Sequence, residues 1–417
     1  MTDRAADDRA RPGVRPLEGL RVIDLSSVVM GPFATQILAD YGADVVKVES
    51  PEGDVLRQAG PMRSRDMGPL HHQVNRNKRG IVLDLKRPGA RDALLRLCRG
   101  ADVFVTNVRP AAMARLRLSW PEVREANPRM VYASLVGYGE AGPYGGRPAY
   151  DDIVQGLCAL PSLFVRAGGD RPRYVAATLA DRVTGISAAH AILAAVVHRD
   201  RTGQGQLVEV PMFETLAQFV LSDHMGGRTF EPAAGASGYE RLLSRDRRPF
   251  ETRDGHVCML LYTSKQWESF FRVIGREAEF RRDPRLHDHA TRARHYDEVY
   301  GLVAEAMRTE TTGHWLEVLQ AEDIPCVRLY CLDDLIDDEH LAATRFFQTL
   351  DHPVDGRLKL VGVPVRWNGE RIGIARAAPR LGEHSVEVLA EAGLTPEEIA
   401  ALIAERATLD GRAGAVE

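Results

Sequence analysis

The sequence predicts an α/β fold: a large domain built on a Rossmann-like parallel sheet, followed by a smaller α+β domain. Three observations support this prediction. Between residues 18 and 136, apolar runs of strand length alternate with runs of helical spacing, and such βαβ repeats form parallel sheets with right-handed crossovers. The chain has 417 residues, which is more than one ordinary core accommodates. A segment rich in Gly and Ala near 225–238 separates two stretches with different patterning.

The elements of the first half follow from local patterns. Strands are expected where apolar residues run together, at 20–25, 44–49, 81–85, 101–106 and 130–136. Gly31-Pro32 opens the first helix, because proline suits the first helical position, and Gly42 ends it. The next helix has its apolar residues on one side, at Ala93, Leu94, Leu97 and Cys98. Short helices are expected around 110–126. Ligands of such sheets bind beyond the carboxyl ends of the strands.

The stretch 176–212 contains the longest predicted helix. Its apolar residues recur at three- and four-residue steps and predict one buried face: Val183, Ile186, Ala189, Ile192, Leu193, Val196 and Val197. Asp181 stands just before that run, at the N-cap position, where unpaired N–H groups and the helix dipole favour the ionised carboxylate. Two roles fit this position: a helix cap, and a nucleophile towards an activated carbonyl carbon. Residues 202–206 end the helix, and a strand is expected at 207–210.

A second unit is expected after the Gly/Ala segment. Phe250–Leu261 is typical of a hairpin that turns at Asp254-Gly255. Helices follow at 265–274, 296–307, 313–321 and 332–339, with a strand at 324–330 and short β segments from 352 to 365. Thr395 with Pro396 begins the last helix. The predicted domains are 17–221 for the large domain, 222–240 for a linker, 241–330 for the small domain, and 331–417 for a second linker and the return to the large domain.

Composition excludes several classes of protein. A formal net charge of −4 gives no electrostatic footprint for nucleic acid. The longest uncharged apolar run, 191–197, is far shorter than the ~20 residues of a membrane span, so no membrane association is expected. Residues 1–16 are charged and lack the apolar core of a signal peptide; they predict a disordered leader.

The cysteines, lysines and histidines carry further expectations. The five cysteines lack CxxC spacing and predict packed, reduced thiols in the cytoplasm, with neither a disulfide framework nor a metal site. Three of the five lysines, Lys47, Lys78 and Lys86, fall close together, either as an anion site or by chance. The histidine pairs are expected on the surface: His71-His72 and His287/His289.

Several catalytic motifs are absent. The first strand–helix turn reads SSVVMGP rather than GxGxxG, so an NAD-dependent redox enzyme has no support. The sequence also lacks the GxxxxGK[ST] loop of phosphate-binding NTPases and the GxSxG elbow of serine hydrolases.

Six motifs, in order, resemble one known family. They are GLRVIDLSSVVMGPFATQILADYGADVVKVESPEGD, NRNKRGIVLDLK, ADVFVTNVRP, PAYDDIVQG, ADRVTGISAAHAILAAVVHRDRTGQGQ and LGEHSVEVL. This set is similar to the class III (CaiB/BaiF) CoA-transferases, a family that includes formyl-CoA transferases, carnitine CoA-transferases and α-methylacyl-CoA racemases. The resemblance covers roughly residues 17–405. It implies an interlocked homodimer, acyl-CoA and a carboxylic acid as substrates, and no tightly bound cofactor.

The resemblance also implies roles for individual residues. Asp181 matches the family's catalytic aspartate, which attacks an acyl-CoA thioester, forms a mixed anhydride, and is then converted by the CoA thiolate into an aspartyl-CoA thioester. An acceptor carboxylate repeats the sequence in reverse. The other matching positions lie by the thioester (Val28, Val29, Met30), along the CoA site (Leu83, Lys86, Asn107, Arg115) and near the reacting carboxylate (Tyr150, Asp151).

Plain structural roles are open for most of these positions. Arg115 and Lys86 could be solvated surface charges. Tyr150 could be a packed side chain with a satisfied hydroxyl, and Asn107 could cap the turn before Arg109.

Departures from the family pattern bear on the substrate. Some transferases of the family carry Gln where Val29 stands and Arg where Ser50 stands. The glycine-rich loop of formyl-CoA transferases has no counterpart between 240 and 265. An apolar or larger acceptor acid is therefore expected rather than an oxalate-like one.

Two other functions stay open. Racemisation needs two acid–base groups, and the family's racemases use a His in a GHD triplet where this chain has Ala149-Tyr150-Asp151. Tyrosine, with a reference pKa near ~10, is a poor base at neutral pH. The third possibility is a subunit of a hetero-oligomeric transferase.

Overall fold

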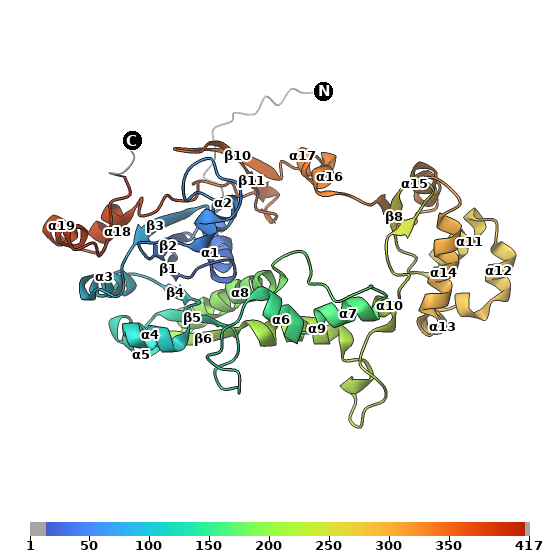
Figure 1. Cartoon of the computed structure of the whole chain (residues 1–417), viewed down its shortest axis with the longest axis horizontal. Coiled ribbons are helices and arrows are strands. Elements are labelled where there is room, and N and C mark those ends of the chain that lie inside the picture. Colours follow the sequence, from blue (N-terminus) through green and yellow to red (C-terminus); the bar gives the residue numbers. More distant parts are fainter. Residues whose placement is uncertain (1–13, 413–417) are drawn as a thin grey trace. The chain divides into compact units, whose positions relative to one another are not determined.

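The computed structural model describes residues 14–412 (Figure 1). Most of the predicted leader, residues 1–13, lies outside the described residues. The described residues divide by their contacts into two units: residues 14–154, 177–216 and 339–412 form the first, and residues 155–176 and 217–338 form the second. The predicted large domain runs without interruption from residue 17 to residue 221. In the structure, residues 155–176 and 217–221 of that range belong to the second unit.

A six-stranded parallel sheet forms the centre of the first unit. Its strands are β1 (Arg21–Leu25), β2 (Asp44–Glu49), β3 (Lys78–Val82), β4 (Val103–Thr106), β5 (Val131–Val136) and β6 (Gln206–Pro211). They lie in the order β3-β2-β1-β4-β5-β6, and each neighbouring pair is parallel. The predicted Rossmann-like sheet is confirmed.

The third strand starts three residues before the predicted 81–85. Its first residues are Lys78 and Arg79, which are buried because they pair with Asp24 and Asp44. A pattern of apolar residues cannot reveal a strand that begins with paired charges.

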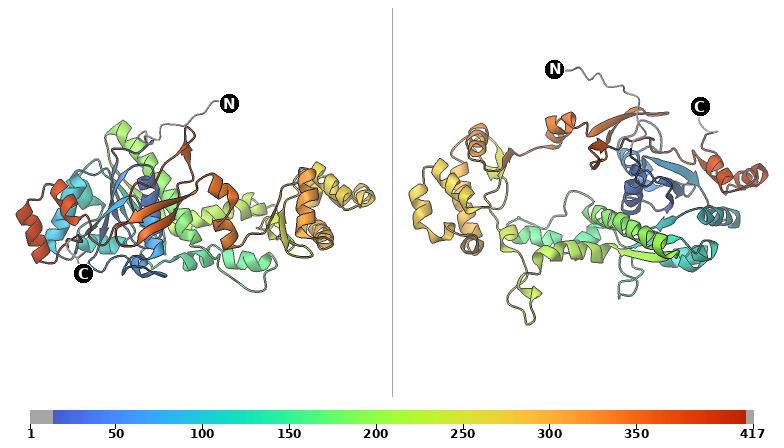
Figure 2. Two further views of the ribbon diagram at one scale, coloured as in Figure 1. Left: turned by 90° about the horizontal axis from the view of Figure 1, so that it is seen from above. Right: turned by 180° about the vertical axis from the view of Figure 1, so that it is seen from behind.

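Helices cover both faces of the sheet (Figures 1 and 2). The helices of the first unit are α1 (Met30–Asp40), α2 (Pro69–Asn75), α3 (Pro88–Arg99), α4 (Pro110–Leu116), α5 (Trp120–Ala126), α8 (Leu179–Thr202), α18 (Ser385–Glu391) and α19 (Pro396–Ala404), with the 3-10 turn η1 (Val55–Gln58). Alternate strand residues, such as Ile23 and Phe104, pack with α3, α4, α5, α18 and α19 into one apolar core. The other face is covered by α1 and α8, which pack side by side.

Helix α8 differs from its predicted form in two ways. It begins at Leu179, so Asp181 lies in its first turn rather than at the N-cap, which is Thr178. Its buried face consists mainly of small residues, while Ile186 is 53% and Val197 50% exposed. The reason is close packing: a Cβ on Gly185 would lie 2.9 Å from the backbone oxygen of Met30.

By length and apolar composition, α8 is the one helix of the described residues that could cross a membrane. Half of its apolar stretch is buried within the protein, and the helix packs against α1, β5 and β6. We interpret it as a core helix of the α/β unit.

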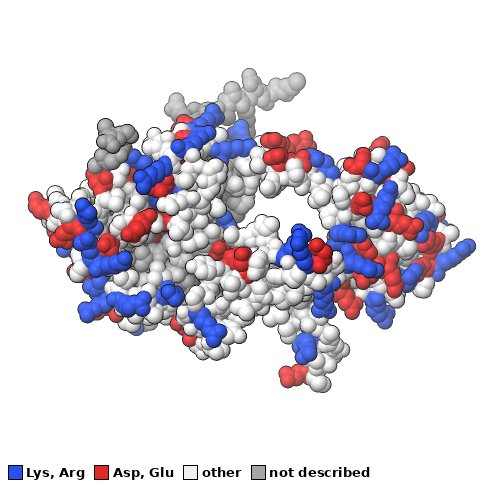
Figure 3. All heavy atoms as spheres, viewed as in Figure 1, with Lys and Arg blue, Asp and Glu red and all other residues white. Residues whose placement is uncertain are grey.

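The second unit has a core of its own. A three-stranded antiparallel sheet is built from β7 (Phe250–Glu251), β8 (His256–Met259) and β9 (Cys326–Arg328), which confirms the predicted hairpin. Its helices are α7 (Leu160–Arg166), α10 (Glu240–Leu243), α11 (Ser264–Val273), α12 (Glu277–Arg282), α13 (His289–Ala293), α14 (Tyr296–Met307), α15 (Thr312–Ala321) and α16 (Leu332–Ile336), with the 3-10 turns η2 (Gly226–Thr229) and η3 (Pro284–Leu286). Aromatic residues, including Trp267, Phe270 and Trp315, fill the space between them. On the face drawn in Figure 3, acidic and basic side chains are interspersed over these helices.

The remaining elements join or follow the units. They are α6 (Asp151–Leu157), α9 (Met212–His224), α17 (Glu339–Ala343) and two hairpins, β10 (Phe347–His352) with β11 (Gly356–Val361) and β12 (Arg366–Trp367) with β13 (Glu370–Arg371). The predicted start of the last helix is confirmed, because Thr395 and Glu398 form a capping box at the N-terminus of α19.

Candidate active site

A cavity of about 430 Å³ lies at the carboxyl ends of β1, β4 and β5. Between β1 and β4 the chain order of the sheet reverses, since β2 lies on the other side of β1. Open α/β sheets bind their ligands at such a switch point, because the loops that leave the two strands diverge there. The cavity is lined by residues of both loops, by the turn after β5 and by the start of α8, among them Asp181.

Asp181 and Asp151 meet at this cavity. The Asp151 carboxylate accepts a hydrogen bond from the backbone N–H of Asp181 at 3.0 Å, and both residues line the wall. Burial, together with the nearby charge of Asp151, raises the pKa of Asp181 from 3.8 to about 7, against the lowering effect of Arg182. Desolvation thus opposes the ionised form of Asp181 that the helix N-terminus favours.

The packing of α8 on α1 fixes the position of Asp181. Gly185 lies one turn after Asp181, where a Cβ would also meet the Phe33 ring at 2.9 Å. The Arg182 guanidinium lies over the same ring, 4.4 Å from its centre. The first turn of α8 is thus held directly against the first turns of α1.

The loop after β1 forms one wall of the cavity. Asn107 binds Ser27 twice: its Oδ1 accepts from the Ser27 N–H at 3.0 Å, and its Nδ2 donates to the Ser27 backbone oxygen at 2.8 Å. Asn107 therefore ties the ends of β1 and β4 together. Val28 and Met30 line the cavity. Val29 does not: its side chain is buried in a small cluster with Leu56 and Val74, so only its backbone could face a ligand.

A second cavity, of about 370 Å³, adjoins the first, and Ser27 and Val28 line both. It lies at the carboxyl ends of β1, β2 and β3, and the predicted site residues Leu83 and Lys86 line it together with Ser50. Arg115 is exposed on α4 and is not among the lining residues of either cavity, although its neighbour Leu116 lines the second.

Tyr150 is 70% exposed and lines the first cavity, so it is not a packed core residue. The motif comparison missed several other lining residues. These come from the loop after β4 (Arg109), from the turns after β5 (Tyr138, Glu140, Arg147) and from the start of α9 (Met212). The sequence signal that could have identified them is their position directly after predicted parallel strands, where ligands of such sheets bind.

Two lysines of the predicted anion cluster are buried. Lys47 and Lys78 have no exposed side-chain surface and pair with Asp54 and Asp24, each at 3.0 Å. Only Lys86 of the three is exposed. Lys47 and Lys78 therefore form no anion site but belong to an internal network of ion pairs.

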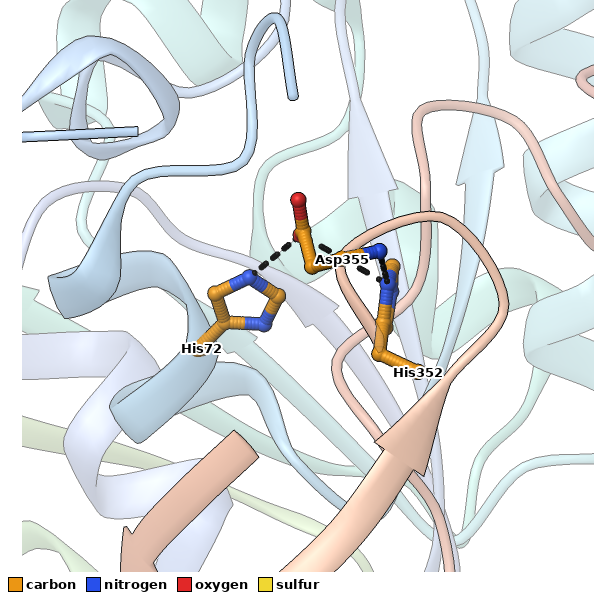
Figure 4. A group of neighbouring side chains, drawn as sticks. All are labelled: His72, His352 and Asp355. Atoms are coloured by element: carbon orange, nitrogen blue, oxygen red, sulfur yellow. Dashed lines mark hydrogen bonds and ion pairs between the residues drawn. The ribbon is translucent and has the colours of Figure 1, made fainter. Parts of the chain in front are cut away.

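The surface expectation is also wrong for His71 and His72, which are buried, whereas His287 and His289 are exposed. His72 Nε2 lies 2.8 Å from Asp355 Oδ2, and His352 lies beside them (Figure 4). Metal-binding atoms of the three residues lie within 4.8 Å of one another. However, His352 Nδ1 accepts hydrogen bonds from the backbone N–H groups of Val354 and Asp355, so its lone pair is engaged. We interpret the group as a structural contact that joins α2 to the β10–β11 hairpin.

The five cysteines are free thiols. Cys98 and Cys158 are buried, and Cys258 and Cys326 are partly buried, but Cys331 is exposed rather than packed.

Comparison with known proteins places the chain in a family. The model of CoA-transferase family III matches residues 17–385. The chain is 33% identical over 404 residues to a formyl-CoA:oxalate CoA-transferase of Streptomyces coelicolor, covering 92% of this chain and 97% of that protein. It is 30% identical over 395 residues to an (R)-2-hydroxy-4-methylpentanoate CoA-transferase of Clostridioides difficile, with the same coverage.

Solved structures agree with this result. The structure of Rv3272 from Mycobacterium tuberculosis in its orthorhombic form is similar with a TM-score of 0.75 and 27% identity, covering 90% of this chain and 99% of that one. A CAIB/BAIF family protein from Brucella suis gives a TM-score of 0.75 and 25% identity, with the same coverage. The protein therefore belongs to CoA-transferase family III, and it is a class III CoA-transferase.

Proposed function

We propose that the protein moves CoA from a donor acyl-CoA to an acceptor carboxylic acid through covalent intermediates on Asp181. An oxygen of the Asp181 carboxylate attacks the thioester carbon, the C–S bond breaks, and CoA thiolate leaves a mixed anhydride. The thiolate attacks the aspartyl carbonyl carbon of the anhydride, which releases the donor acid and leaves an aspartyl-CoA thioester. The acceptor carboxylate then reverses both steps, so no proton is gained or lost overall.

The observation that carries this proposal is the place of Asp181. Its carboxyl group is buried, yet the residue lines a cavity at the switch point of the sheet. A poorly hydrated carboxylate is a stronger nucleophile than a solvated one, and a dry site protects the anhydride from hydrolysis. A helix cap alone would not require the cavity.

The second cavity supports a place for the body of CoA. CoA is long, and the two cavities meet at Ser27 and Val28. In this arrangement the thioester lies in the first cavity beside Val28 and Met30. Asn107, in the wall of the first cavity, and Leu83 and Lys86, in the second, hold the remainder of CoA. Arg115, exposed on α4, would reach phosphate groups outside the cavity. CoA is then a substrate and not a resident cofactor.

The acceptor is proposed to have an apolar body. Val28, Met30, Tyr138 and Met212 line the first cavity, and burial against them favours hydrocarbon. Ser50 lines the second cavity, away from Asp181. The C. difficile relative is named for a branched hydroxy acid, which fits this chemistry.

A homodimer in the cytoplasm is proposed as the working form. Ile186 and Val197 of α8, and Leu332 of α16, are large apolar side chains that are 50% exposed or more. A second copy of the chain would cover such residues. Free thiols fit a reducing compartment. Sedimentation equilibrium of the purified chain measures the dimer directly, and a monomer would contradict it.

The decisive experiment is intact-protein mass spectrometry after incubation with a panel of acyl-CoAs. Wild type is expected to gain the mass of an acyl or CoA adduct, and peptide mapping after hydroxylamine treatment should locate it at Asp181. Asp181→Asn is the matched control, because it keeps the size of the side chain but removes the nucleophile.

The two alternatives give different outcomes. If no adduct forms and solvent deuterium enters the α-carbon of an acyl-CoA, the chain is a racemase. If neither occurs with any donor, and activity needs a second kind of chain, it is a subunit of a hetero-oligomeric transferase.

A further inference from the structure

Two residues of the loop between β1 and α1 (residues 26–29), Ser27 and Val28, line both cavities. Within it, Val28 has a φ of 67°, in the left-handed region. A β-branched residue is strained in that conformation and keeps it only where surrounding groups hold it.

The Asp54 carboxylate contacts the backbone N–H of Val28. Its two carboxylate oxygens lie 3.3 and 3.2 Å from the Val28 nitrogen, and Oδ1 also accepts from the Leu56 N–H at 3.0 Å. The backbone N–H of Asp54 donates to Glu49 Oε1 at 2.9 Å, so Asp54 is itself fixed to the end of β2.

Lys47 holds the same loop from β2. Its Nζ donates to Asp54 Oδ2 at 3.0 Å and to the Ser26 backbone oxygen at 2.9 Å. The side chains of Lys47 and Asp54 are 0% and 1% exposed, and such buried charge-assisted hydrogen bonds are strong and directional. Lys47 and Asp54 also border the second cavity, but the Lys47 ammonium group directs its hydrogen bonds to the loop and to Asp54.

We propose that Lys47 and Asp54 are positioning residues for CoA transfer: they clamp the main chain of Ser26 and Val28 in the shape that places the thioester against Asp181. The inference rests on the proposed function in taking the Asp181 cavity as the place of transfer. Neither side chain touches the reacting atoms, so both act through the Val28 backbone.

The test begins with Asp54→Asn, which keeps the size of the side chain and one acceptor oxygen but loses the charge. We expect kcat for CoA transfer, per folded molecule, to fall about 10- to 100-fold, because small displacements in an active site have effects of this size. The donor KM should change far less. If kcat stays within about twofold of wild type, or if only KM rises, the proposal is overturned.

A matched control separates positioning from stability. Asp40 and Arg76 form another buried pair, at 2.7 Å, which contacts neither the loop nor the two cavities. Asp40→Asn should lower the melting temperature, as Asp54→Asn does, without lowering kcat per folded molecule. An equal loss of kcat in both variants would reduce the role of Asp54 to stability and overturn the proposal.

A double-mutant cycle tests the route through Val28. Glycine adopts positive φ without strain, so Asp54→Asn should lower kcat less in the Val28→Gly protein than in the Val28 protein. An equal loss in both backgrounds overturns the proposal. If Asp54→Asn does not fold, Lys47→Met takes its place in the cycle. The steady-state transfer rate is the readout throughout, so failure to trap an Asp181 adduct would count against the covalent route and not against the clamp.

Discussion

The carboxylate of Asp151, at the start of α6, accepts the backbone N–H of Asp181 at 3.0 Å. One carboxyl group therefore caps the helix that carries the other. The arrangement orients Asp181 while raising its pKa, since two negative charges at one site disfavour each other. Asp151 thus favours the protonated form of the proposed nucleophile.

The first prediction concerns the pH dependence of acylation. Because the pKa of Asp181 is about 7, kcat/KM for the donor should rise with pH to a plateau, with a midpoint near 7. Asp151→Asn should move the midpoint to lower pH but not as far as 3.8, because burial, the largest cause, remains. Asp152→Asn, on the exposed next residue, is the control and should leave the profile unchanged. Equal midpoints for wild type and Asp151→Asn would contradict the coupling.

The second prediction concerns stability. The folded chain binds the Asp181 proton more tightly than the unfolded chain does, so this group's stabilising contribution is lost as pH rises from about 4 to about 7. Asp181→Asn removes the buried charge. Its free energy of unfolding at pH 8 should exceed that of wild type by roughly 1–4 kcal/mol, and the difference should shrink towards pH 4. Urea denaturation at several pH values measures it, and a pH-independent difference would refute the argument.

The third prediction concerns the packing of α8 on α1. A Cβ at residue 185 would lie 2.9 Å from both Met30 O and Phe33 Cδ1. Gly185→Ala should therefore destabilise the protein by about 1–3 kcal/mol and lower kcat, because it displaces the helix that carries Asp181. Gly301→Ala, in the middle of α14, is the control: its nearest neighbour lies 3.9 Å away, and it should be neutral or stabilising by up to about 1 kcal/mol. Thermal melts and measurements of kcat test this prediction. A Gly185→Ala protein with the stability and kcat of wild type would contradict it.

The fourth prediction concerns acid sensitivity. His71 is buried between Pro379 and Asn75: its Nε2 lies 3.1 Å from the Pro379 oxygen, and Asn75 Nδ2 lies 3.0 Å from its Nδ1. Burial, with the charge of Arg57, holds the pKa of His71 well below 6.5. The unfolded chain then binds this proton first, so stability falls as pH drops below 6.5.

Its test is the slope of unfolding free energy against pH between 6 and 5. His71→Gln should reduce that slope by about 1.4 kcal/mol per pH unit, whereas His287→Gln, on the surface, should not. Identical slopes for wild type and His71→Gln would show that another group is responsible.

The sequence by itself determined the sheet and the identity of the family. Strand β2, at Asp44–Glu49, was predicted at its observed ends, and the other strands of the sheet lie close to their predicted positions. Such predictions succeed because apolar runs and helix caps are local features: a few neighbouring residues determine a strand or a cap. Asp181 was identified from its motif, and the structure places it in a cavity.

The tertiary structure decided which polar residues are buried and which predicted site residues meet. Lys78 and His71 are buried because their partners come from elsewhere in the chain: Asp24 for one and Pro379 for the other. Val29 packs inward and Arg115 lies outside the cavities for the same kind of reason. A sequence pattern records the period of an element, but burial and pairing depend on which distant elements pack against it, and the pKa of Asp181 depends on both.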